Sequence, residues 1–238
     1  MSARSVPRRV QGVDALRGIA LLMMFAYHFS FDLRYYRVAA FDFEHDPFWL
    51  GFRALIVASF MTLVGLSLVL ADRSGSTPTH FWRRVAVIAA CAIAATAASY
   101  VLFPKTFITF GILHCIAVTS VIARPFARRP AIALALGAAI VVAGIAYANA
   151  AFDTSALDWI GFRTVKPATE DYVPLAPWSG FAFAGIALGN ALARSGFGAL
   201  APLGQAPQWL RFLGRHSLFA YMVHQPIFFA LLWMAFGR

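Results

Sequence analysis

Seven apolar stretches divide this sequence, and each is near the length that crosses a lipid bilayer. The hydrocarbon core of a bilayer is about 30 Å thick, so a helix needs roughly 20 apolar residues to span it. In chain order the stretches are Val13–Leu33, Phe48–Ala71, Phe81–Phe103, Phe107–Ala123, Ala131–Ala151, Val173–Ala193 and Leu213–Phe236. They take up most of the 238 residues. We therefore predict an all-α, polytopic membrane helix bundle of about seven transmembrane helices that forms one domain over residues 1–238.

The composition excludes a soluble domain. Hydrophobic residues make up 61% of the chain and charged residues only 13%, whereas a soluble domain needs far more polar cover for its surface. The net charge of +10 does not indicate a nucleic-acid partner, because the basic residues occur singly or in pairs between apolar stretches. The two cysteines lie inside apolar stretches, and no metal-ligand spacing is present. We expect the lipid bilayer as a partner, and neither a metal nor nucleic acid.

The basic residues predict the orientation in the membrane. If the N-terminus is cytoplasmic, 13 of the 20 Lys and Arg residues fall on the cytoplasmic side and seven on the outer side. The positive-inside rule then predicts an N-in, C-out topology. The first stretch follows basic residues, as a signal peptide would, but Asp14, Arg17, His28 and Asp32 interrupt it and no small-residue cleavage site follows. We expect it to be retained as a helix.

Two ionisable residues of the first stretch are candidate catalytic groups. His28 and Asp32 are four residues apart, so they lie on one face of a helix. A carboxylate beside an imidazole fixes its tautomer and raises its basicity, which prepares a general base. Ionisable side chains within a membrane are functional candidates by default. The alternative is a structural hydrogen bond that locks two helices together.

Three more histidines join the list of candidate catalytic residues. His114 lies about two turns into the fourth stretch and His224 about 11 residues into the last one. At 1.5 Å per residue, both reach the middle-to-outer depth of His28, so we predict that the three converge on one intramembrane site. Each could instead only join helices. His45 lies in the acidic loop 42–46, either as a catalytic group at a cavity mouth or as a solvated residue.

Basic residues at the cytoplasmic ends of the stretches are candidates for binding an anionic cofactor, since arginine suits phosphate groups. The set is Arg17, Arg83, Arg84, Arg215 and His216. Two of them have a structural alternative. Arg17 follows Asp14 by three residues and would form an ion pair that anchors the helix, and Arg215 would contact lipid head groups.

Residues toward the outer face are candidates for substrate binding. Asp171 and Trp178 flank the proline-rich start of the sixth stretch, where Asp171 would face an outer cavity and the tryptophan would anchor the interface. Tyr221 and Gln225 lie in the last stretch, beside Pro226, which should kink that helix. Together with His114 and His224, they are also candidates for stabilising an oxyanion.

Several of these segments together resemble a known family. The runs Val13–Ala20 and Tyr27–Leu33 are similar to the bacterial branch of the heparan-alpha-glucosaminide N-acetyltransferase-like membrane proteins. Further matches are Gly65–Leu68, Phe110–His114, Asp171–Trp178, Gly214–Leu218 and His224–Pro226. The resemblance covers nearly the whole chain. It implies a multi-span fold that transfers an acetyl group from cytoplasmic acetyl-CoA to an acceptor across the membrane.

The resemblance also bears on the catalytic residues. In the lysosomal relatives the acceptor is the amine of a terminal glucosamine. Their catalytic histidine lies on the non-cytoplasmic loop after the first conserved helix, and an asparagine occupies the place of His28. This sequence departs from that pattern, because it has His28 in the helix, and its loop histidine, His45, does not align without a gap.

We therefore predict an acyltransferase of the bacterial inner membrane that moves an acetyl or short acyl group onto an amino-sugar or other glycan acceptor, with His28 as the base. Direct transfer and a route through acetyl-histidine both stay open. A small-solute or proton-coupled transporter is an alternative, because intramembrane His and Asp beside a Pro-broken helix also occur in carriers. A non-catalytic subunit of a membrane assembly is a third. The sequence leaves the oligomeric state open, a homodimer included.

Overall fold

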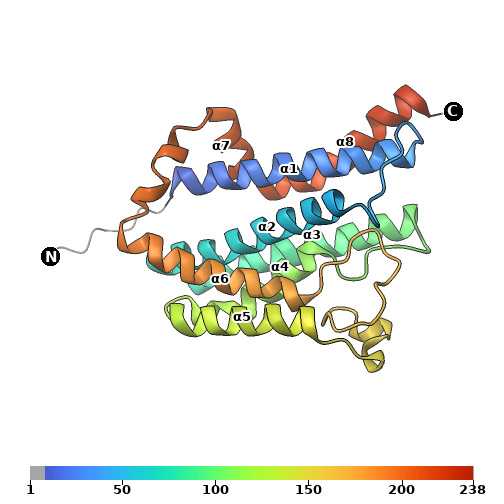
Figure 1. Cartoon of the computed structure of the whole chain (residues 1–238). Helices are drawn as coiled ribbons and strands as arrows, with labels where there is room; N and C mark the ends of the chain where they lie inside the picture. The colour runs from blue at the N-terminus through green and yellow to red at the C-terminus, as the bar shows by residue number, and fades with distance from the viewer. Residues whose placement is uncertain (1–8, 238) are drawn as a thin grey trace. The chain divides into compact units, whose positions relative to one another are not determined.

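The computed structural model describes residues 9–237, which contain eight α-helices and no β-strand (Figure 1). The helices are α1 (Gln11–Tyr35), α2 (Pro47–Arg73), α3 (Pro78–Leu102), α4 (Ile112–Ala123), α5 (Pro130–Ala146), α6 (Leu175–Arg194), α7 (Gln208–Arg215) and α8 (Ser217–Phe236). The predicted all-α class is confirmed. Three arginines counted for the topology, Arg4, Arg8 and Arg238, lie outside the described residues.

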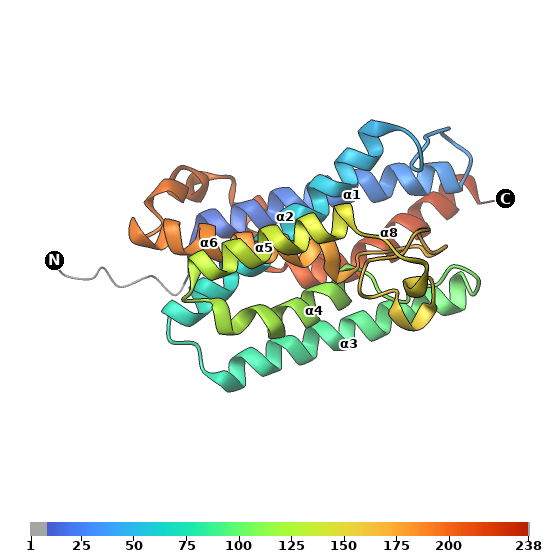
Figure 2. The ribbon, with the colours of Figure 1, turned by 60° about the horizontal axis from the view of Figure 1, so that its bottom comes forward.

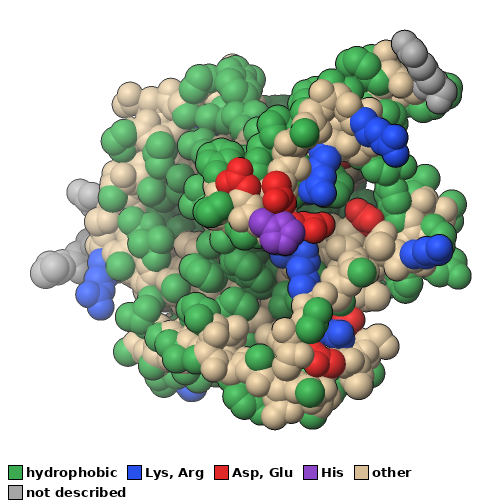
Figure 3. Space-filling model, turned by 45° about the vertical axis from the view of Figure 1, so that its right-hand side comes forward, with side chains coloured by type: hydrophobic (Ala, Val, Ile, Leu, Met, Phe, Trp, Pro, Cys, Tyr) green, Lys and Arg blue, Asp and Glu red, His purple; other side chains and the backbone are tan. Residues whose placement is uncertain are grey.

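Five of the helices, α1, α2, α3, α6 and α8, are long and apolar enough to cross a membrane. Large apolar side chains are widely exposed, as at Val101 (78%) and Ile145 (76%), and hydrophobic side chains cover much of the face in Figure 3. Soluble proteins rarely expose apolar surface on this scale. The chain is therefore a multi-pass membrane protein. The shorter apolar helices α4 and α5 occupy the two remaining positions of the seven predicted spans.

Helix α4 is shorter than the span predicted over Phe107–Ala123. It begins at Ile112 and has 12 residues, about 18 Å at 1.5 Å per residue, which is less than the hydrocarbon thickness. The residues before it are not helical because side chains of α3 bind their backbone groups. The Thr96 hydroxyl donates to the Ile108 carbonyl oxygen at 2.8 Å, and the Ile108 N–H donates to Ser99 Oγ at 3.0 Å.

The stretch predicted as Leu213–Phe236 is divided between two helices. Helix α7 ends at Arg215 and α8 begins at Ser217, and the backbone of His216 between them is not helical. Arg215 and His216 therefore lie at a helix junction rather than inside a span. Pro226 lies within α8, where it removes the hydrogen bond to the carbonyl group four residues earlier.

The chain groups into two compact units. The first contains Met61–Ala199, and the second contains Val10–Phe60 and Leu200–Arg238. Each unit is described by itself below. The prediction of one domain stays a prediction.

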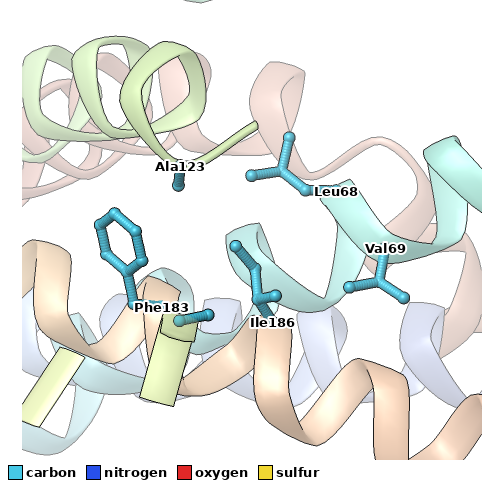
Figure 4. Close-up of a cluster of buried hydrophobic side chains, with 6 residues drawn as sticks. Leu68, Val69, Ala123, Phe183 and Ile186 are labelled. Carbon is cyan, nitrogen blue, oxygen red and sulfur yellow. The ribbon is translucent and has the colours of Figure 1, made fainter. Parts of the chain in front are cut away.

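In the first unit, α5 and α6 lie side by side (Figures 1 and 2) and approach closely at two glycines. A Cβ atom on Gly137 would lie 2.7 Å from the carbonyl oxygen of Gly180, and a Cβ on Gly180 would lie 2.6 Å from that of Gly137. Small residues allow this approach of helices in membranes. Beside this contact lies a buried cluster, shown in Figure 4, that contains Leu68, Val69, Ala123, Ala133, Phe183 and Ile186.

In the second unit, α7 packs on the first half of α1 through glycine. A Cβ on Gly18 would collide with the carbonyl oxygen of Leu210, and a Cβ on Gly214 would collide with that of Asp14. These contacts hold α7, with Arg215 as its last residue, against the beginning of α1.

Helices α1 and α8 run parallel in the second unit. The residue pairs that join them advance in the same direction along both helices: His28 with His224, Asp32 with Gln225, and Tyr36 with Phe229. Two parallel spans start on the same side of a membrane and end on the other. A parallel arrangement of α1 and α8 is the one that the N-in, C-out topology requires, and the orientation itself stays a prediction.

Candidate active site

A hydrogen bond joins His28 of α1 to His224 of α8. His28 Nδ1 lies 2.6 Å from His224 Nε2, the ring planes are inclined by 11°, and the ring centroids are 4.9 Å apart. With the nitrogens so close and the centroids so far apart, the rings meet edge to edge in nearly one plane rather than face to face. The N–H of one ring therefore points at the lone pair of the other. The structure brings together these two of the three histidines that were predicted to converge.

The hydrogen-bond partners assign the protons of this pair. Nδ1 of His224 lies 2.5 Å from the Tyr221 carbonyl oxygen, which can only accept, so Nδ1 carries a hydrogen. In the neutral imidazole, Nε2 of His224 is then an acceptor, and His28 donates to it from Nδ1. Neither nitrogen of His224 offers a hydrogen to a substrate oxyanion in this arrangement.

The remaining nitrogen of the pair, Nε2 of His28, carries a lone pair. It has no hydrogen-bond partner among the described residues, and it is not one of the fully buried side-chain atoms that lack a partner there, so part of its surface is exposed. The His28 side chain is half-buried. An oriented imidazole nitrogen that is open on one side is suited to act as a general base.

Aromatic side chains surround His224, which is 4% exposed. The ring of Phe25 stacks on it, with centroids 5.3 Å apart, and the rings of Tyr221 and Phe228 meet it edge-on at 5.6 and 5.7 Å. The two phenylalanines were not among the residues predicted from the sequence. Their signal was helical spacing, since Phe25 precedes His28 by three residues and Phe228 follows His224 by four.

Asp32 does not pair with His28, which corrects the dyad predicted from their spacing. The Asp32 side chain is fully buried, and its Oδ1 accepts from Gln225 Nε2 at 3.3 Å. The other oxygens of both groups, Asp32 Oδ2 and Gln225 Oε1, are buried without a hydrogen-bond partner. The spacing of four residues places His28 and Asp32 on one face of α1. They bind different residues of α8, however, because His28 contacts His224 and Asp32 contacts Gln225.

The loop histidine forms a dyad of its own. His45 Nδ1 lies 3.2 Å from Asp42 Oδ2, and both side chains are exposed. The backbone N–H groups of Glu44 and His45 also donate to Asp42, and these bonds lower the pKa of its carboxyl group. Phe43, which is buried, packs against Tyr27, the neighbour of His28. The second unit therefore holds two candidate bases, one in a helix and one in a loop.

His114 has structural partners on both ring nitrogens. The Gly111 N–H donates to Nδ1 at 3.3 Å, which closes the first turn of α4. Nε2 then carries the hydrogen, and it lies 3.4 Å from Thr96 Oγ1, which itself donates to Ile108. His114 belongs to the first unit, so its predicted convergence with His28 and His224 stays a prediction.

Asp171 and Trp178 also lie in the first unit. Asp171 Oδ2 accepts from the backbone N–H of Ile112 at 2.8 Å, so this carboxylate stabilises the start of α4. Trp178 stacks on Phe181 within α6, at 5.9 Å between ring centroids. These contacts give both residues a structural role. Their role in substrate binding stays a prediction.

The predicted cationic residues are distributed over both units. Arg17 Nη1 lies 3.3 Å from Asp14 Oδ1, so the expected ion pair is present. Arg215 and His216 are exposed, and His216 Nδ1 donates to the Phe212 carbonyl oxygen at 3.0 Å. Arg83 and Arg84, which are exposed on α3, lie in the other unit.

These features define a helical membrane protein in which a hydrogen-bonded pair of histidines joins two parallel helices. The family heparan-alpha-glucosaminide N-acetyltransferase, catalytic, matches residues 9–226, and the chain belongs to this family of membrane acetyltransferases. No curated protein and no solved structure matched the chain. The matched range includes both candidate bases and the whole histidine pair.

Proposed function

We propose that the protein transfers an acetyl or short acyl group from acetyl-CoA to an amine or hydroxyl of an amino sugar or other glycan, with His28 as the general base. In the proposed topology the donor comes from the cytoplasm and the acceptor lies on the outer face of a bacterial inner membrane. The observation that carries the proposal is Nε2 of His28. It is an oriented lone pair, within the described residues it has no partner, and it belongs to a member of an acetyltransferase family.

The chemistry asks for a group that takes a proton as the acceptor attacks the thioester carbonyl. An amine or hydroxyl that donates to His28 Nε2 would give up its proton there, and a positioned base of this kind accelerates transfer by about 10²–10⁴-fold. The hydrogen bond from His28 Nδ1 to His224 holds the imidazole in the required tautomer. Direct transfer needs no covalent enzyme intermediate, so we prefer it to a route through acetyl-histidine.

The donor requires cations for its phosphates, and we assign this role to two arginines of the second unit. The contact of Gly214 with Asp14 places α7 beside the start of α1, so Arg215 and Arg17 flank the same helix contact. Arginine guanidinium groups bind phosphate with directed hydrogen bonds. Arg215 is exposed, which suits a group that binds a soluble donor. The exposed guanidinium group of Arg215 supports acetyl-CoA as the donor, and Arg17, which pairs with Asp14, would add positive charge beside it.

The test is an assay of purified protein in lipid nanodiscs with radiolabelled acetyl-CoA and a panel of amino sugars and oligosaccharides. We expect label in an acceptor product, identified by mass spectrometry, and an increase in melting temperature when CoA is added. A protein stabilised by a glycan or other solute but never by CoA, with no labelled product, would instead favour the carrier.

A further inference from the structure

We propose that His224 accepts the proton that His28 releases from Nδ1 during acyl transfer, so that the two histidines form a proton relay. The inference rests on the proposed function and assigns a role to the second histidine of the pair. During the reaction, positive charge would pass from the substrate side of His28 to the buried ring of His224.

The geometry suits a transfer between the rings. The two nitrogens are 2.6 Å apart, and the rings are nearly coplanar. A hydrogen on His28 Nδ1 therefore already points at the lone pair of His224 Nε2, and a shift of less than 1 Å moves it across. A carbonyl or hydroxyl oxygen would orient His28 equally well, but of these three acceptors only an imidazole also binds a proton near neutral pH.

The protons and electron pairs balance over one turnover. The acceptor N–H or O–H loses its proton to His28 Nε2 while its lone pair forms the bond to the thioester carbonyl carbon. The His28 Nδ1 proton moves to His224 Nε2, and the C–S bond breaks with its electrons going to sulfur. When His224 returns its proton to His28 Nδ1, Nε2 of His28 gives up its proton to the thiolate. The products are the acylated acceptor and CoA thiol.

The surroundings of His224 can hold the transferred charge. As an imidazolium it would donate from Nδ1 to the Tyr221 carbonyl oxygen and from Nε2 to His28, so both N–H groups would be satisfied. The ring centroid of Phe25 lies 5.3 Å from that of His224, within the range of a cation–π interaction. Asp32 is bound by Gln225, the residue next to His224 in the sequence, and not by His224 itself.

The titratable groups around the pair are few. Tyr221 and Tyr27 pack against His224 and His28, respectively, and Asp32 lies one helical turn beyond His28 on α1. No arginine or lysine hydrogen-bonds either histidine among residues 9–237. A proton that enters the pair therefore has the two imidazoles as its acceptors.

The decisive variant is His224→Gln, because a Gln Oε1 atom can accept from His28 Nδ1 and keep the ring oriented but cannot take up its proton. We expect kcat to fall about 100-fold or more, with the KM for acetyl-CoA and the melting temperature unchanged and the pH profile of kcat altered. His80→Gln, an exposed histidine of α3, is the matched control and should keep full activity. If His224→Gln retains kcat within about threefold, His224 only orients His28 and the relay is wrong.

A second readout is independent of activity. In protein labelled with ¹⁵N-histidine, we expect a scalar coupling across the hydrogen bond between His28 Nδ1 and His224 Nε2, and a hydrogen on Nδ1 of His224. The absence of that coupling would overturn the relay even in an active enzyme. A wild-type protein that transfers no acyl group would overturn the proposed function, and the relay with it, whereas active wild type with active His224→Gln overturns the relay alone.

Discussion

Asp32 and Gln225 share a single hydrogen bond, from Gln225 Nε2 to Asp32 Oδ1, and each keeps a buried oxygen without a partner. This contact lies one residue beyond the His28–His224 pair on α8 and four residues beyond it on α1. It links the same two helices through an amide and a carboxyl group, each of which has one oxygen that accepts no hydrogen bond.

The contact between Asp32 and Gln225 predicts that Asp32→Asn does not destabilise the protein. The new amide can donate to Gln225 Oε1 and still accept from Gln225 Nε2, which satisfies both orphaned groups. We expect a melting temperature equal to or above that of the wild type, with activity retained. Asp32→Leu removes the partner of Gln225 and should cost about 1–3 kcal/mol. A folded but inactive Asp32→Asn protein would mean that the carboxylate itself takes part in the reaction.

Two glycines of α2 should respond differently to alanine. A Cβ on Gly65 would collide with the carbonyl oxygen of Ala182, and it would lie 2.8 Å from the N atom of Ile186, so Gly65→Ala must push α2 and α6 apart. We expect a loss of about 1–3 kcal/mol in the free energy of unfolding. Gly51 has nothing within 4 Å of its Cβ position, so Gly51→Ala should be neutral or slightly stabilising. Equal effects in unfolding titrations would contradict the close packing of α2 on α6.

His114 is expected to act through the structure of α4. His114→Ala removes the side chain that binds both Gly111 and Thr96, and we expect a loss of about 1–3 kcal/mol. Thr96→Val breaks the same network, so the two changes should be less than additive in a double-mutant cycle. An inactive His114→Ala protein of unchanged stability would instead favour the catalytic role first predicted for this residue.

Arg215 tests the proposed site of the donor. Arg215→Gln should raise the KM for acetyl-CoA about tenfold, which corresponds to about 1.4 kcal/mol, and leave kcat unchanged. Arg129→Gln, an exposed arginine before α5, is a control of equal charge change on the same predicted side of the membrane. If the two variants behave alike, only the net charge of that face matters and Arg215 binds no phosphate.

The sequence predicted the elements whose physics is local. Hydropathy and span length located the long helices to within a few residues, because crossing a bilayer depends on the composition of the segment itself. The start of α4 was missed because Thr96 and Ser99, from a different helix, hold the preceding backbone. The division at His216 was missed because α7 is held by the contact of Gly214 with the backbone of Asp14.

In the candidate site, too, the local features could be predicted from the sequence and the contacts between helices could not. Spacing placed His28 and Asp32 on one face of α1, and depth placed His224 near His28. Which side chains would pair depended on the register of α8, and no pattern in the sequence specifies the register of two parallel helices. The aromatic surround of His224 followed from that register as well, although the spacing of Phe25 and Phe228 indicated it.

The central claim is that the histidine in the helix, rather than the one in the loop, accepts the acceptor's proton. Its most direct test is the rate of acetyl transfer by the His28→Ala and His45→Ala proteins, measured side by side in nanodiscs. Equal melting temperatures of the two variants would show that both are folded. We predict at least a 100-fold loss for His28→Ala and near-wild-type activity for His45→Ala. A fully active His28→Ala protein, or the loss of activity on changing His45 alone, would contradict the account.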